Sequence, residues 1–445
     1  MASSTYLSRT PSSTTNQKTF TISVWIKKSS PVTNEWIIRA TNSSGDAGGL
    51  YFNPTGNLFC NFEISGSNIV NLKTNRLFRD TNAFYNIVLA CDTTQGTASD
   101  RVKIYINGVQ ETSFGTTLYP DQNDDLVINR NVPHFIGTDS TGGANIEAVM
   151  SHFNFCDGLA LAPTVFGSTD STTGEWQINT SPSFTLGTNG FTILKDGNTI
   201  TDQSSNSNNW SLSAGTLTKT EDNPSNVFAT WNPLIGRNNS GTNLVPSLSN
   251  GNTTSSSDGS TWQVGLSTLA ASSGKYYKEV KWISDSNTRY SEIGLYDVDA
   301  YAQKITGYPY MPDMANCYGL RDSDGKIRTG GSATSYGVSY GPNNIISVAM
   351  DLDNNKLYYA KDGVWMNSAN PSSGTGGFSI TANKTYSFGL QQYAVGNITF
   401  STNFGNGYFG TTAVSSAGTN ASNNGIFEYD VPTGYTALST KGLNL

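Results

Sequence analysis

The 445-residue sequence has few charged side chains. Asp, Glu, Lys and Arg together make up 13% of the chain, whereas ordinary soluble domains have roughly 25%. Ser, Thr, Asn and 45 Gly take their place. Thr, Tyr, Phe and Val favour strands, whereas long charged side chains favour helices. Because no stretch keeps an apolar period of 3.6 residues, the sequence predicts an all-β protein with little helix.

Basic residues are too few and too scattered for a nucleic-acid-binding surface. The chain carries 26 Lys and Arg against 33 Asp and Glu, a net charge of −7. A phosphate-binding face needs clustered Lys and Arg, and the longest basic run is Lys27-Lys28. We therefore expect no nucleic-acid partner.

Long hydrophobic runs are also missing. Residues 1–19 are polar and rich in Ser and Thr, without the basic and apolar regions of a signal peptide. No apolar run approaches the roughly 18 residues that a membrane-spanning helix needs. We expect a chain that is made in the cytoplasm and does not insert into a membrane.

Catalytic residues are hard to assemble from this sequence. His134 and His152 are the only two histidines, and neither accompanies a nucleophile motif. The carboxylate triplet of retaining glycosidases is absent. Glu292 stands at an odd separation from Asp297 and Asp299, which places it on the opposite strand face. The sequence therefore predicts that the protein is not an enzyme.

The four cysteines predict neither a zinc site nor a defined disulfide framework. Cys60, Cys91, Cys156 and Cys317 show no CxxC spacing. Buried free thiols are the favoured interpretation, because free Cys packs as a small apolar residue. A Cys60–Cys91 or Cys91–Cys156 bridge remains open.

One acidic loop could hold a cation. Asp121, Asn123 and Asp125 place three oxygen-bearing side chains in a loop between expected strands, and such ligands suit Ca²⁺. Acidic loops are more often solvated than metal-bound. We therefore expect no cofactor, with calcium at this loop as the alternative.

The clearest local pattern is Ile345 to Trp365, IISVAMDLDNNKLYYAKDGVW. Two apolar strands are separated by the turn 353–355, and a second turn follows at 361–363. Asn, Asp and Gly tolerate the left-handed backbone of tight turns. The pattern predicts a hairpin within an antiparallel sandwich.

This hairpin resembles the core of SPRY domains, a family of β-sandwiches used for binding. Supporting motifs occur in the family's order over about residues 262–409: GKYYKEV at 274–280, IGLY at 293–296, YSFGL at 386–390, and ITF at 398–400 followed by NFG at 403–405. The resemblance implies a second, SPRY-like sandwich.

The N-terminal third resembles a laminin G/concanavalin A-like jelly roll. The motifs are FTISVWIK at 20–27, YNIVLA at 85–90, VKIYING at 102–108, HFIG at 134–137 and residues 148–158. Residues 157–234 extend the likeness, and the segment 427–435 resembles the tail that commonly ends the same proteins. The tandem as a whole resembles tail and virion-surface proteins of bacteriophages.

These resemblances imply two antiparallel β-sandwich (jelly-roll type) domains joined by a polar linker region. The predicted boundaries are a laminin G/concanavalin A-like jelly roll at 1–167, a linker with short strands at 168–260, a SPRY-like sandwich at 261–410 and a C-terminal tail packed on a sandwich at 411–445.

The implied function is that of a non-enzymatic phage virion surface protein, of the tail-fibre or receptor-binding type, that recognises host cell-surface glycan. The first alternative is a structural capsid- or tail-decorating fibre protein with no ligand of its own, and the least favoured is a glycan hydrolase. The implied partners are other virion proteins and a host glycan or receptor. A homo-oligomer is expected, with a trimer favoured, and the implied location is the virion.

Aromatic loops of the second sandwich are the candidate ligand site, since Tyr combines flat apolar area with a hydroxyl group. The alternative is that these rings fill the ends of the sandwich. The candidates are Tyr301, Tyr308, Tyr310 and Tyr318 in one loop, and Tyr336, Tyr340, Trp365 and Tyr393 in a second group.

Overall fold

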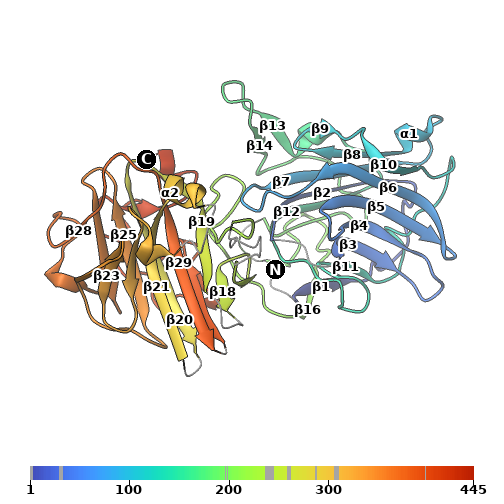
Figure 1. Cartoon of the computed structure of the whole chain (residues 1–445). Coiled ribbons are helices and arrows are strands. Elements are labelled where there is room, and N and C mark those ends of the chain that lie inside the picture. The colour runs from blue at the N-terminus through green and yellow to red at the C-terminus, as the bar shows by residue number, and fades with distance from the viewer. Residues whose placement is uncertain are drawn as a thin grey trace. The chain divides into compact units, whose positions relative to one another are not determined.

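The computed structural model describes residues 4–29, 34–195, 197, 199–235, 245–257, 262–285, 288–304, 310–395 and 397–444. The chain forms two compact units, one of residues 1–219 and 223–225 and the other of residues 220–222 and 226–445. Strands dominate both units (Figure 1). The prediction of an all-β protein with two antiparallel sandwiches and little helix is confirmed.

Two large sheets form the sandwich of the first unit. The eight-stranded sheet has the order β10 (Phe114–Leu118), β6 (Ser67–Leu77), β5 (Asn57–Ile64), β4 (Ala47–Phe52), β3 (Glu35–Thr41), β11 (His134–Ile136), β1 (Tyr6–Arg9) and β16 (Ser211–Ala214). The six-stranded sheet has the order β15 (Phe191–Ile193), β12 (Ala148–Asp157), β2 (Thr19–Lys28), β7 (Tyr85–Asp92), β8 (Val102–Ile106) and β9 (Val109–Gln110).

Alternation along β2 explains how these sheets come together. Phe20, Ile22, Val24 and Ile26 occupy every second position, so they share one face of the strand, and all of them are buried in the same core. Side chains of the eight-stranded sheet, such as Leu50, complete that core. Each large apolar side chain buried in this way contributes about 1.5–3 kcal/mol to folding.

The segment that follows β12 also belongs to the first unit. It contains η1 (Pro163–Val165) and the hairpin β13 (Gly167–Thr169) and β14 (Trp176–Ile178). Further on, β15 pairs with β12 and β16 pairs with β1. Phe191 and Trp210 are buried in the first core and stack edge-on at 5.2 Å. Residues 168–219 of the predicted linker thus carry short strands and cluster with the first unit.

The second unit also contains two large sheets. One has the order β17 (Ser247–Ser249), β18 (Thr254–Ser257), β30 (Ile398–Asn403), β20 (Lys275–Ser284), β25 (Ile345–Asp351), β26 (Lys356–Lys361) and β27 (Val364–Trp365), with β28 (Phe378–Ser379) on β26 and β33 (Thr436–Ala437) on β20. The six-stranded sheet has the order β19 (Gln263–Ala271), β29 (Tyr386–Val395), β21 (Thr288–Asp297), β22 (Tyr318–Arg321), β23 (Lys326–Thr329) and β24 (Ser332–Ser335).

The hairpin predicted at 345–365 is confirmed. Strand β25 pairs with β26 and β26 with β27, in antiparallel register. Both turns use left-handed backbone, with φ of 54° at Asn355, 49° at Asp362 and 81° at Gly363. Side chains of β25 and β26 pack against Ile293 and Phe388 of the opposite sheet. The turn chemistry and the buried face together fix this register.

The remaining elements are short. They are α1 (Ala98–Arg101), α2 (Val298–Gln303), η2 (Met311–Asp313), η3 (Met366–Ser368), η4 (Gly442–Asn444), and the two-stranded ladder of β31 (Tyr408–Phe409) and β32 (Thr412–Ala413). Among the described residues, no helix has the length and apolar character to cross a membrane. The four cysteines are buried and unpaired, as the favoured interpretation predicted.

Candidate functional site

Three of the predicted ligand tyrosines lie in the core of the second unit. Tyr318, Tyr336 and Tyr340 are 5%, 7% and 6% exposed. The Tyr318 hydroxyl accepts a hydrogen bond from the backbone N of Thr381 at 3.0 Å, and the Tyr340 hydroxyl donates to the Leu320 carbonyl at 2.9 Å. Their expected exposure is therefore wrong. Tyr318, on β22, and Tyr336 and Tyr340, in the loop between β24 and β25, all pack into the core between the two sheets.

Two further candidates are only partly exposed. Tyr301, on α2, packs edge-on against Tyr296 with ring centroids 5.5 Å apart, and burial raises its pKa to about 12. Trp365, on β27, packs beside the buried Tyr277 at 6.5 Å. Both rings mainly support the fold. Tyr308 lies outside the described residues.

Tyr310 and Tyr393 join an aromatic cluster on the second unit, which we call the aromatic shelf. It consists of Trp262, Tyr290, Tyr310 and Tyr393. The Trp262 ring lies 4.8 Å from Tyr310, 5.4 Å from Tyr393 and 6.1 Å from Tyr290. Tyr290 and Tyr393 are 6.0 Å apart. Tyr290 is 38% exposed and the other three rings are partly exposed, so the shelf lies at the surface.

Strand register explains why the shelf forms. Tyr290 on β21 is the direct cross-strand partner of Tyr393 on β29, and Figure 1 shows these two strands side by side. Direct partners of an antiparallel pair project to the same face. Ile293 and Leu390, of opposite parity, point into the core. The shelf therefore occupies the outer face of the six-stranded sheet, with Trp262 immediately before β19.

A row of polar side chains lies beside the shelf on the same face. Glu292 pairs with Gln391 on one side and with Arg321 on the other. The Arg321 guanidinium stacks over the Tyr290 ring at 5.3 Å. Arg328 Nε lies 3.9 Å from Glu292 Oε1. We call Glu292, Arg321, Arg328 and Gln391 the polar row.

Close packing by the η2 segment covers one end of the polar row. The Met311 backbone N donates to Gln391 Oε1 at 2.7 Å. A Cβ at Gly319 would lie 2.7 Å from Met311 Sδ, and one at Gly389 would lie 2.7 Å from Met311 Cε. A Cβ at Gly319 would also lie 2.9 Å from Glu292 Cβ, and one at Gly389 2.6 Å from Tyr296 Cδ2, so a larger residue at either position would displace the side chains packed on this face.

The polar row contains buried atoms without hydrogen-bond partners. Glu292 is 3% and Gln391 0% exposed. Glu292 Oε2, Gln391 Nε2 and Arg328 Nε find no partner among the described residues. Burial raises the pKa of Glu292 to about 8, although Arg328 and Arg321 oppose this shift. The Glu292 carboxyl therefore holds its proton more tightly than an exposed glutamate does.

A second aromatic surface occurs on the first unit, which we call the aromatic ladder. Trp36, Tyr51 and Phe59 lie on the neighbouring strands β3, β4 and β5 in register. Their ring centroids are 4.6 Å and 4.8 Å apart. Arg39 lies over Trp36 at 4.7 Å, and Lys73 lies over Phe59 at 5.7 Å. Both units thus present stacked rings with cations.

Sequence reasoning placed Tyr310 and Tyr393 in the candidate site but missed Trp262, Tyr290 and Arg321. The signal for Tyr290 was its parity, since it shares a strand face with Glu292 and not with Ile293. That signal becomes useful only when the partner strand and its register are known.

The proposed calcium loop is held partly by the chain's own cations. The Asp125 carboxylate lies 3.9 Å from Lys18 Nζ, and the Asp121 backbone N donates to Asp124 Oδ2 at 2.8 Å. The part of the chain that the structure describes has no group of three or more His, Cys, Asp or Glu side chains placed to hold a metal ion. Calcium binding by Asp121, Asn123 and Asp125 stays a prediction.

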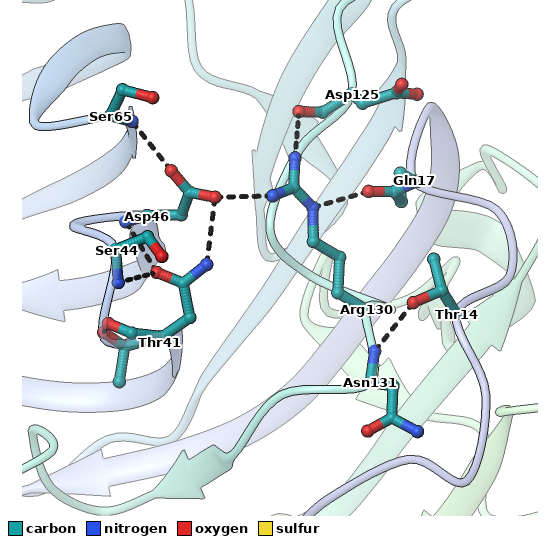
Figure 2. A network of polar contacts seen from close by, with 10 residues as sticks. Thr14, Gln17, Thr41, Ser44, Asp46, Ser65, Asp125, Arg130 and Asn131 are labelled. Atoms are coloured by element: carbon teal, nitrogen blue, oxygen red, sulfur yellow. Dashed lines mark hydrogen bonds and ion pairs between the residues drawn. The ribbon is translucent and has the colours of Figure 1, made fainter.

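Arg130 connects this loop to the sheet beside it (Figure 2). Its Nη1 donates to Asp46 Oδ2 at 2.7 Å, its Nη2 to the Asp125 carbonyl at 3.2 Å and its Nε to Gln17 Oε1 at 2.5 Å. The Ser65 backbone N–H and Arg130 hold the pKa of Asp46 below its usual value. Arg130 thus pairs with Asp46 and hydrogen-bonds the backbone of the loop at Asp125.

The two histidines have different local surroundings. His134 Nε2 accepts from the Asn129 backbone N at 3.2 Å, and Nδ1 contacts the Val132 carbonyl at 2.8 Å. Burial lowers the pKa of His134 to about 4, so it is neutral and supports the fold. His152 Nδ1 lies 2.7 Å from the Ser151 hydroxyl at a bulge in β12.

Residues 2–165 match the family model of the concanavalin A-like lectin/glucanases superfamily. The first sandwich therefore has a lectin-like fold, which in general suggests binding of carbohydrate or another ligand. Such folds are typically non-catalytic binding domains. No curated protein matches the chain.

Several solved structures share low identity with this chain. The SPRY domain of human HERC1 is 13% identical, and the match covers 34% of this chain and 87% of that one with a TM-score of 0.26. Another human SPRY domain is 15% identical over 34% of this chain and 91% of that one, with a TM-score of 0.24. The heptameric SAP-like pentraxin from Limulus polyphemus is 18% identical over 36% and 71%, with a TM-score of 0.27. Because these TM-scores are low, the fold assignment rests on the family match and on strand topology.

Proposed function

We propose that this chain is a non-enzymatic surface protein of a bacteriophage virion that recognises glycan on the host cell. The lectin-like fold of residues 2–165 supports a ligand-binding role. The phage setting is supported by the tandem order of the two sets of sandwich motifs and by the tail motif at 427–435. In this proposal other virion proteins are its permanent partners, and a trimer is the favoured assembly.

The observation that carries glycan recognition is the aromatic shelf. Sugar rings have apolar faces that pack on aromatic side chains, while Tyr hydroxyls offer hydrogen bonds at the ring edge. Tyr290 and Tyr393, 6.0 Å apart, give two neighbouring platforms, and Trp262 extends them. The polar row lies on the same face. Ligand sites usually combine apolar and aromatic surface with a few polar groups that orient the ligand.

The test is binding of the purified chain to bacterial cells with intact and with polysaccharide-stripped surfaces. We expect saturable binding to intact cells of a susceptible host that disappears after stripping. The double variant Tyr290→Ala/Tyr393→Ala should lower affinity at least tenfold. Tyr51→Ala/Phe59→Ala, on the aromatic ladder, is the matched comparison and should change the affinity by no more than about twofold. A tenfold loss of affinity corresponds to about 1.4 kcal/mol of binding free energy.

The alternative structural role makes the opposite prediction. A capsid- or tail-decorating fibre protein without its own ligand would bind neither intact nor stripped cells at micromolar concentration, and it would co-purify with virions. Repeating the assay with a calcium chelator tests the proposed loop of Asp121, Asn123 and Asp125. Sedimentation of the intact chain tests the expected trimer.

A further inference from the structure

We infer that the ligand of the aromatic shelf is an acidic saccharide, whose carboxylate binds Arg321 while its sugar ring packs on Tyr290 and Tyr393. This inference rests on the proposed glycan-binding function and names the chemical class of the glycan. Three features of the outer sheet face support it: the position of Arg321, its uncompensated charge and the unpartnered polar atoms beside it.

The first feature is the position of Arg321. Its guanidinium lies 5.3 Å from the centre of the Tyr290 ring, and Tyr393 lies 6.0 Å from Tyr290 on the neighbouring strand. These distances are comparable with the width of a pyranose ring. A sugar packed on the two tyrosines therefore brings a substituent within reach of the guanidinium, which stacking on Tyr290 holds in a fixed orientation.

The second feature is charge. Among the described residues, no carboxylate forms an ion pair with Arg321, and its guanidinium makes no hydrogen bond. Glu292, its cross-strand partner, is buried, and burial raises its pKa to about 8 although the charges of Arg328 and Arg321 oppose this shift. Arg328 is shared between Glu292 and Asp324, at 3.9 Å from each. Arg321 is thus a partly exposed cation without an ion pair or hydrogen bond of its own among the described residues.

Arginine favours a carboxylate over a hydroxyl for geometric reasons. A guanidinium can donate two parallel hydrogen bonds to the two oxygens of one carboxylate, and such charge-assisted pairs are about twice as strong as neutral ones. A neutral sugar offers only single hydroxyl acceptors. Arg321 on the shelf therefore predicts discrimination between acidic and neutral sugars, which aromatic stacking alone does not provide.

The third feature is the set of unpartnered atoms in the polar row. Glu292 Oε2, Gln391 Nε2 and Arg328 Nε are buried without hydrogen-bond partners among the described residues, although Arg328 Nε lies 3.9 Å from Glu292 Oε1. Such atoms in folded proteins are usually met by ordered water or by a ligand. Because these atoms are buried, a saccharide on the shelf does not contact them directly. An ordered water beside Arg321 would pair with them and can bridge to a polar ligand on this face.

The experiment compares a surface polysaccharide that binds the chain with the same material after chemical reduction of its carboxylates to alcohols. This reduction leaves sulfate and phosphate substituents intact. We expect the wild-type chain to bind the native polymer at least tenfold more tightly than the reduced one. Arg321→Met should bind both polymers alike. Arg321→Lys, which keeps the charge but not the paired donors, should recover only part of the preference.

Arg39→Met is the matched comparison, because Arg39 stacks on Trp36 of the aromatic ladder and should keep the full preference. Far-UV circular dichroism and the thermal midpoint verify that each variant is folded. If Arg321→Met does not fold, the wild-type comparison of native with reduced polymer and the Arg321→Lys variant still decide the question.

Several outcomes overturn the inference. If the wild type binds native and reduced polymer equally, the ligand is not recognised through a carboxylate, although the chain still binds glycan. If the wild type still binds the reduced polymer but Arg321→Met does not, the anion that Arg321 binds is a sulfate or a phosphate and not a carboxylate. Loss of preference with Arg39→Met and not with Arg321→Met moves the anion site to the first unit. If no surface polysaccharide binds at all, the proposed function itself fails.

Discussion

At the scale of single residues, the most unusual side chain is Lys278 on β20. It is 0% exposed, and its Nζ lies 4.5 Å from the Trp231 ring, 4.9 Å from Phe388 and 5.7 Å from Phe404. Its Nζ donates a long hydrogen bond of 3.4 Å to the Gly389 carbonyl. Burial lowers its pKa well below the ordinary 10.5, and no carboxylate opposes this shift.

We predict that Lys278→Met raises the free energy of unfolding by about 1–3 kcal/mol at neutral pH, because Met fills similar volume without a buried amine. The pKa of Lys278 is lower in the folded chain than in the unfolded chain. Between these two values the unfolded chain binds a proton that the folded chain does not, so wild-type stability falls as pH falls. Denaturant unfolding from about pH 10 to about pH 7 measures this.

The advantage of the variant should therefore grow as the pH decreases from about 10. Lys441→Met, the same change at an exposed lysine, serves as the control and should be close to neutral. A large loss of stability in Lys278→Met, with the same pH dependence as the wild type, would show that the aromatic rings hold a charged ammonium through cation–π attraction.

At the scale of elements, the C-terminal segment lies against β20. Its Phe427 ring meets Tyr277 at 4.9 Å. The carboxylate of Glu279 accepts hydrogen bonds from the backbone N atoms of Glu428 and Tyr429, both at 2.9 Å. It also accepts from the Tyr277 hydroxyl at 3.1 Å and from Asn403 Nδ2 at 3.2 Å. One buried side chain thus attaches this segment to the sheet.

We predict that Glu279→Gln destabilises the second unit by about 1–3 kcal/mol, since an amide group would face backbone donors and leave at least one of them unpaired. Limited proteolysis followed by mass spectrometry should show earlier cleavage near residues 427–435. Glu175→Gln, at an exposed position of the first unit, should change neither stability nor cleavage. Unchanged cleavage in Glu279→Gln would mean that apolar contacts alone hold the segment.

At the scale of the whole molecule, each unit has its own core. Phe191 and Trp210 contribute to the first core, whereas Trp231 belongs to the second. The Asp222 carboxylate accepts from the Phe228 backbone N at 3.1 Å, so residues 220–222 belong with the second unit. Domains with separate cores usually fold independently.

We therefore predict that fragments 1–219 and 220–445 each fold cooperatively, and that the intact chain shows two calorimetric transitions that match those of the fragments. Fragment 1–167, which ends at the predicted boundary, should be unstable or aggregate. It lacks β15 and β16, so it exposes the edges of β12 and β1 and part of the core. A fragment 1–167 as stable as 1–219 would show that the later strands are dispensable.

How far the site could be predicted depended on strand pairing. The sequence singled out aromatic residues of the second sandwich as a group, and two of them, Tyr310 and Tyr393, lie on the aromatic shelf. Tyr318 and Tyr340, from the same group, are buried. Tyrosine suits both a core and a surface, so residue type alone could not separate them. Buried and exposed tyrosines can be told apart only by their position along a strand whose partner and register are known.

Alternation and turn residues act over a few neighbouring positions, so they were enough to predict the all-β class and the tight hairpin at 345–365. It also indicated buried cysteines, since apolar strand contexts are local. Only the tertiary structure decided that Trp262, Tyr290 and Arg321 meet on one face, and that β15 and β16 complete the first sandwich. Both depend on which distant strands pair and in what register, and a shift of one residue moves every side chain to the opposite face.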